Sequence, residues 1–78
     1  MAFDYSKLEG KIKEVFGTQG KFASAVNLSE KSLSKKLNNK SSWTQPEIMR
    51  SCELLAINNL EINLYFFNEK VQHAELLT

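Results

Sequence analysis

The sequence predicts an all-α domain in which five short helices pack around one core. Apolar residues recur at intervals of three and four residues through most of the chain, as on the buried face of an amphipathic helix. Threonine, serine and asparagine, which cap helices, separate these segments. A length of 78 residues suits one domain, so we expect a core at about residues 5–67 and a short tail at 68–78.

The first helix is expected over residues 5–16 because its apolar residues share one face. The inward positions are Leu8, Ile12, Val15 and Phe16. Asp4 or Ser6 is expected to cap this helix, and Gly17 to end it. Gly10 costs roughly 1 kcal/mol relative to alanine, so a neighbouring element is expected to approach closely there.

Residues 19–37 predict two short helices joined by a tight turn. Thr18 is the expected N-cap of the first of them. Its apolar stripe, about two turns long, is formed by Phe22, Ala23 and Val26. Asn27 then interrupts the pattern, and asparagine tolerates the left-handed conformation that ends a helix.

The second helix of this pair has a buried edge and an exposed cationic side. Ser29 supplies the cap, and Leu33 and Leu37 form the buried edge. At 100° per residue, the opposite side carries Lys31, Ser34, Lys35 and Asn38. This stripe contains two cations and no acid, which indicates a surface for a polyanion, although such a run of charge is also typical of a solvated helix face.

A fourth helix follows Thr44, which forms a capping box with Glu47. Its inward positions are Ile48, Cys52, Leu55 and Ala56. Trp43, just before it, is interpreted as an anchor of the core rather than a ligand-stacking residue. Cys52 is interpreted as a small buried hydrophobe, because no second cysteine or neighbouring histidine suggests a reactive or metal-binding thiol.

The last helix, residues 60–67, is apolar nearly all round, with Asn58 and Glu61 spaced as a cap and its partner. Such a helix either closes the core or offers a surface for a dimer or another partner, and the sequence favours neither. The candidate partner residues are Leu60, Leu64, Tyr65 and Phe67. In the tail, periodicity is compatible with a strand or with a helical turn, and the lone His73 is assigned no metal or catalytic role.

The charges of the chain are unevenly distributed. The formal net charge is only +1, but residues 18–43 sum to +4 and residues 44–78 to −3. The positive end therefore coincides with the predicted two-helix unit. No signal peptide or membrane span is visible, so we expect a soluble cytoplasmic protein without a membrane partner.

The two-helix unit resembles the helix-turn-helix of Cro- and lambda-repressor-type phage regulators. The matching residues are Gln19, Ala23, Leu28, Leu33 and Leu37. Asn27 departs from the glycine that is most frequent in that family. The wider chain, through FDYSKLEGKI, LSEKSLSKKLNN and YFF, is also similar to small phage proteins labelled Cro repressors. The resemblance implies a lambda-repressor-like fold, encoded by a phage or prophage.

That resemblance implies a repressor that inserts residues 29–37 into the major groove of double-stranded operator DNA. The implied base-reading residues are Glu30, Lys31, Ser34 and Lys35. Lysine donates to guanine, glutamate accepts from cytosine and serine reads either kind of edge. The residues expected to hold the phosphate backbone are Gln19, Gly20, Lys36, Asn39 and Lys40.

The alternative is an anti-repressor, or modulator of repression, that binds the cognate phage repressor and blocks its contacts with the operator. It is favoured by the absence of arginine from residues 19–37 and by the acidic C-terminal third. Both roles belong to the switch between lysogeny and lysis. We expect no enzyme, because no carboxylate pair, nucleophile and base, or phosphate loop is visible, and we expect no cofactor and no metal.

Overall fold

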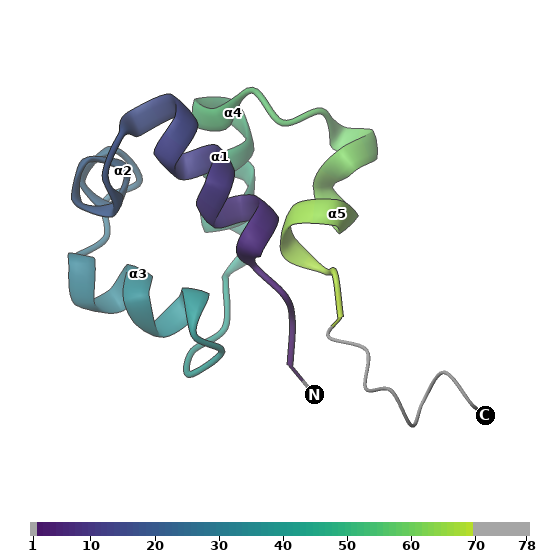
Figure 1. The fold of residues 1–78 in the computed structure, drawn as a ribbon, viewed down its shortest axis with the longest axis horizontal. Coiled ribbons are helices and arrows are strands. Elements are labelled where there is room, and N and C mark those ends of the chain that lie inside the picture. The colour runs from purple at the N-terminus through teal and green to yellow at the C-terminus, as the bar shows by residue number, and fades with distance from the viewer. Residues whose placement is uncertain (1, 70–78) are drawn as a thin grey trace.

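The computed structural model describes residues 2–69, which form an all-helical fold (Figure 1). The elements are α1 (Ser6–Phe16), α2 (Gln19–Ala25), α3 (Glu30–Leu37), α4 (Gln45–Leu55), the 3₁₀ turn η1 (Asn59–Glu61) and α5 (Ile62–Phe66). Within residues 2–69 the only β pairing is an isolated bridge between Phe3 and Glu69. The predicted all-α class with five helices is confirmed. The expectations for the tail beyond Glu69, His73 included, lie outside the described residues.

α1 is the central element of the fold. It contacts α2, α4 and α5, and Figure 1 shows α2 and α3 on one side of it and α5 on the other. Leu8 and Ile12 of α1 are almost fully buried, as predicted. The largest side chains buried with them come from four other segments: Phe22, Leu33, Leu55 and Phe66.

Three predictions for α1 were wrong. Val15 is 46% exposed, because Phe16 rather than Val15 makes the contact with α2, its ring centroid 5.3 Å from that of Phe22. No atom lies within 4 Å of the place where a β-carbon on Gly10 would be, so no neighbour approaches closely there. The helix begins after Tyr5, with neither expected cap in place, although Asp4 Oδ1 accepts a hydrogen bond of 2.9 Å from Ser6 N.

The ends of α2 and α3 follow the predicted local chemistry. Thr18 Oγ1 accepts from Lys21 N at 3.2 Å, and Ser29 Oγ accepts from Ser32 N at 3.1 Å. Asn27 adopts the left-handed conformation with φ 65°, which lets the chain turn sharply between the two helices. Leu28 N donates to Ala23 O at 2.8 Å and closes this turn.

α4 begins with the predicted capping box. Thr44 N donates to Glu47 Oε1 at 2.9 Å, and Glu47 N donates to Thr44 Oγ1 at 3.3 Å. Cys52 is buried as expected, and burial raises the pKa of its thiol. Ala56 is not on the inward face: it is exposed and ends α4 in the left-handed conformation with φ 54°.

Candidate functional site

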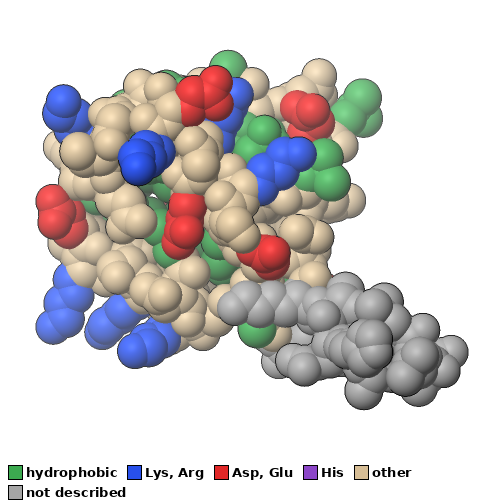
Figure 2. All heavy atoms as spheres, in the orientation of Figure 1, with side chains coloured by type: hydrophobic (Ala, Val, Ile, Leu, Met, Phe, Trp, Pro, Cys, Tyr) green, Lys and Arg blue, Asp and Glu red, His purple; other side chains and the backbone are tan. Residues whose placement is uncertain are grey.

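Exposed lysines gather on one side of the molecule, along α3 and the loop after it, and we name Lys31, Lys35 and Lys40 the lysine face (Figure 2). Leu33 and Leu37 are 0% and 5% exposed, so the buried edge of α3 is as predicted. Of the implied base-reading residues, all four lie on the exposed surface of α3. A role in reading bases stays a prediction.

The N-terminus of α2 is less open to a phosphate than the sequence suggested. Gln19 is exposed, but Gly20 lies beneath the side chain of Glu30. The carboxylate of Glu30 occupies the place where a β-carbon on Gly20 would be. The Glu30 carboxylate beside Gly20 repels an anion that approaches this side of the helix end. This arrangement opposes the phosphate contact that was predicted for Gly20.

Lys36 is not available to a phosphate, contrary to prediction, because its side chain turns into the protein. It is 7% exposed, and its Nζ donates to Ser42 O at 2.7 Å and lies 2.9 Å from Glu47 Oε1. Burial acts to raise the pKa of Glu47. The hydrogen bond from Thr44 N and the Lys36 ammonium outweigh it, so the pKa lies below its ordinary value.

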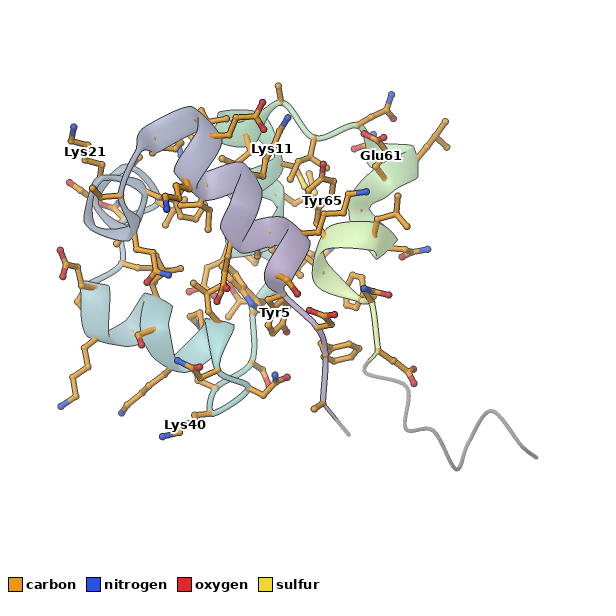
Figure 3. All side chains as sticks on the ribbon, in the orientation of Figure 1. Tyr5, Lys11, Lys21, Lys40, Glu61 and Tyr65 are labelled. Atoms are coloured by element: carbon orange, nitrogen blue, oxygen red, sulfur yellow. The ribbon has the colours of Figure 1, made fainter. Side chains whose placement is uncertain are left out.

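Asn39 also has another role than the expected phosphate contact. Its Oδ1 accepts from Phe3 N at 2.8 Å, and its Nδ2 donates to Phe3 O at 2.9 Å. The side chain thus pairs with both backbone groups of Phe3 and ties the N-terminal segment to the loop after α3. Lys40, the next residue, points away from the body of the molecule (Figure 3).

Four segments of the chain meet to form a cleft of about 360 Å³, which we name the aromatic cleft. They are the N-terminal segment, the loop between α3 and α4, the N-terminal part of α4, and the end of α5. Its apolar lining is Phe3, Tyr5, Trp43, Ile48, Phe66 and Phe67. Its polar rim is Asn39, Lys40, Ser41 and Ser42. The sequence predicts no such cleft, because the spacing of residues within one segment does not report a contact between four segments.

The aromatic rings of the cleft contact one another. The centroids of Trp43 and Phe66 are 5.1 Å apart in an edge-to-face arrangement, and those of Phe3 and Phe67 are 6.1 Å apart. Trp43 is half-buried and packs against the core, as predicted, but it also lines the cleft. Tyr5 lies in the core, and burial raises the pKa of its hydroxyl, although the neighbouring Trp43 acts to lower it.

The candidate partner residues near the end of the chain divide into two groups. Leu60, Leu64 and Phe67 are 89%, 47% and 47% exposed, so they are free to contact a partner. Tyr65 is 8% exposed and faces the core, with the Lys7 ammonium 5.4 Å from its ring centroid, so its assignment to a partner surface was wrong. Only Phe67 of these four lines the aromatic cleft.

Other kinds of site were sought in the part of the chain that the structure describes. Residues 2–69 contain no group of three potential metal ligands. Over the same residues, no helix is both long and apolar enough to cross a membrane.

Comparison with known proteins identifies the family of the chain and a similar solved structure. A family model described as "Protein of unknown function (DUF739)" matches residues 1–69. The chain is also similar to the modulator of repression (MOR) of the temperate bacteriophage TP901-1 from Lactococcus lactis, known from a solution structure. The two share 49% sequence identity over 92% of this chain and 97% of that one, with a TM-score of 0.76. No curated protein matches the chain.

Proposed function

The chain belongs to the family described as Protein of unknown function (DUF739), and on this premise we propose that it is a modulator of phage repression that binds its cognate repressor. The observation that carries the proposal is the 49% identity with the modulator of TP901-1 over nearly the whole chain. This supports the anti-repressor interpretation over a Cro-like repressor. Membership of the Cro superfamily stays a prediction.

The aromatic cleft is the surface on which we expect the repressor to dock. Ligand sites are concave and mostly apolar with a few polar groups, and about 360 Å³ falls within their usual range. The cleft has apolar walls and a rim of amide, ammonium and hydroxyl groups. It therefore suits an apolar side chain of the partner that is flanked by hydrogen-bonding groups, as in the centre of many interfaces.

The acidic C-terminal part of the chain, residues 44–78, also suits binding to a repressor. Residues 44–78 sum to −3, and the acidic residues among those that the structure describes include the exposed Glu53, Glu61 and Glu69. A repressor turns a basic surface to DNA, because phosphate contacts supply much of its affinity. An acidic partner beside that surface would be attracted to it and would repel DNA.

The proposal is tested by mixing the purified chain with the repressor encoded in the same phage genome. We expect a stoichiometric complex by size-exclusion chromatography, and release of a labelled operator fragment from the repressor. No complex at micromolar concentrations, together with an undisturbed repressor–operator complex, would show that the proposed function is wrong.

Phe67→Asp and Leu60→Asp form a matched pair that locates the docking surface. Both residues are exposed and apolar, but only Phe67 lines the cleft. Burying an aromatic side chain contributes about 1.5–3 kcal/mol, so Phe67→Asp should weaken repressor binding by about tenfold or more. Leu60→Asp should leave the affinity within about threefold, as is usual outside a contact surface. Equal losses would place the repressor elsewhere.

A second candidate function, binding of operator DNA, is supported by the lysine face. Lys31, Lys35 and Lys40 are exposed, and no ion pair to them is found among residues 2–69. Direct DNA binding would weaken with salt in proportion to the phosphates engaged. Lys31→Glu combined with Lys35→Glu should abolish it while leaving the helix content unchanged. Docking of the repressor in the cleft should survive this change.

A further inference from the structure

We propose that Lys36 is a positioning residue for partner binding, because its buried ammonium holds the loop that forms one wall of the aromatic cleft. The effect of Lys36 on affinity for the repressor rests on the proposed function. The geometry itself does not, since it involves only residues of this chain. Lys36 belongs to α3, the carbonyl that it binds belongs to the loop, and the carboxylate that it faces belongs to α4.

The loop of residues 38–44 is held at three places. At its start, Asn39 is paired with the backbone of Phe3. At its end, Thr44 is bound in the capping box of α4. Between these two lie Ser41, Ser42 and Trp43, which line the cleft, and Lys36 Nζ reaches the carbonyl of Ser42 at 2.7 Å. Lys36 thus supplies the polar contact to the cleft-lining part of the loop, beside the packing of Trp43 against Phe66.

Burying the Lys36 ammonium at this place costs more free energy than burying an apolar side chain would. Moving a charge out of water costs several kcal/mol, and replacing a buried ion pair with apolar groups is often neutral or stabilising. Lys36 is 7% exposed, and its partner Glu47 would keep its hydrogen bond to Thr44 N without it. A hydrogen bond from a charged donor to one chosen carbonyl, in contrast, fixes the loop in one position, which an apolar side chain does not do.

A loop held in its bound position before the partner arrives increases affinity, because less conformational freedom is lost on binding. Removing the Lys36 ammonium should therefore weaken partner binding through the loop, even where the fold keeps its stability. This separates a positioning residue from a residue that only stabilises the fold.

The test uses the double variant Lys36→Met with Glu47→Gln. Methionine preserves the apolar stem, and the glutamine oxygen can still accept from Thr44 N, so no unpaired charge is left in the protein. We expect urea unfolding to give an equilibrium constant within about twofold of the wild-type value, because the two opposite charges are removed together. The affinity for the cognate repressor should nevertheless fall about tenfold. Lys35→Met, an exposed neighbour on the same helix, should change neither quantity.

Trp43 gives a readout that needs no partner. It is the only tryptophan of the chain and lies in the loop itself, so acrylamide quenching of its fluorescence reports on this wall of the cleft. The double variant should be quenched about twice as efficiently as wild type, because the loop opens more often. Ile12→Val, a small change in the core away from the loop, should leave quenching unchanged.

The outcomes separate this inference from the proposed function. Unchanged quenching and unchanged repressor affinity in the double variant would overturn the role of Lys36. The role of Lys36 would also be overturned if the loss of repressor affinity only followed the loss of stability. In that case Ile12→Val, compared at the same unfolding free energy, would weaken repressor binding as much as the double variant does. If the wild-type chain does not bind the repressor, the proposed function fails, and the quenching result alone decides whether Lys36 holds the loop.

Discussion

Replacing Asn39 should detach the N-terminal segment from the loop after α3. Its side chain accepts from Phe3 N at 2.8 Å and donates to Phe3 O at 2.9 Å, joining positions 36 residues apart in the chain. The residue also has φ 63°, in the left-handed region that asparagine and glycine adopt more readily than other residues. Substitution therefore removes two hydrogen bonds and, depending on the new residue, introduces backbone strain.

The two effects can be separated by comparing glycine with alanine. A hydrogen bond contributes about 1 kcal/mol net, so Asn39→Gly should lower the free energy of unfolding by about 2 kcal/mol without straining the backbone. Asn39→Ala should cost a further 1 kcal/mol or so, because alanine resists the left-handed conformation. For a domain of this size, the glycine variant should melt roughly 10 °C below wild type.

Urea unfolding followed by far-ultraviolet circular dichroism measures these differences. Lys40→Ala is the matched control, because Lys40 is the exposed neighbour on the cleft rim, and its unfolding free energy should change by less than about 0.5 kcal/mol. A glycine variant as stable as wild type would show that the two contacts with Phe3 contribute nothing in solution. An alanine variant no less stable than the glycine variant would refute the strain argument.

Three further results are expected. Leu33→Ala, at a fully buried position, should lower the free energy of unfolding by about 2–5 kcal/mol, whereas Leu60→Ala, at an 89% exposed one, should change it little when both are melted side by side. Because the folded-state pKa of Glu47 lies below its ordinary value of 4.5, its contribution is complete above that value and is lost as the pH falls through the folded pKa. Acid titration of stability should show this loss in wild type and not in Glu47→Gln. The thiol of Cys52 should react with Ellman's reagent only as fast as the protein opens, since it is buried and its pKa is raised; rapid labelling of the native chain would contradict its placement in the core.

The fold could be predicted from the sequence largely because its signals are local. Helical spacing identified Leu33 and Leu37 as buried, and the spacing of Thr44 and Glu47 identified a capping box. The turn at Asn27 needs only its own backbone preference. Such features depend on a few neighbouring residues, so a single sequence contains most of the information about them.

The candidate site could be predicted only in part, because its contacts join distant segments. The assignment of Lys36 to DNA could have been avoided, since at 100° per residue it lies only about 60° from Leu33, on the buried flank of α3. Nothing in the sequence, however, indicated that Asn39 would bind Phe3 or that Trp43 would meet Phe67 across one cleft. These arrangements follow from how the helices pack, which periodicity does not report.

The two candidate surfaces share a loop, and this decides which lysine tests them best. Lys40 belongs to the lysine face and also to the rim of the aromatic cleft. Lys40→Glu would therefore weaken both the binding of DNA and the binding of the repressor. Lys35 accepts a hydrogen bond of 2.8 Å from Lys40 N through its backbone carbonyl, a contact that a change of its side chain leaves in place, and it lines no part of the cleft. Lys31 lies in the first turn of α3 and lines no part of the cleft. Lys31→Glu should therefore weaken DNA binding and leave repressor binding intact, and a loss of repressor binding in that variant would place the partner on α3 instead of in the cleft.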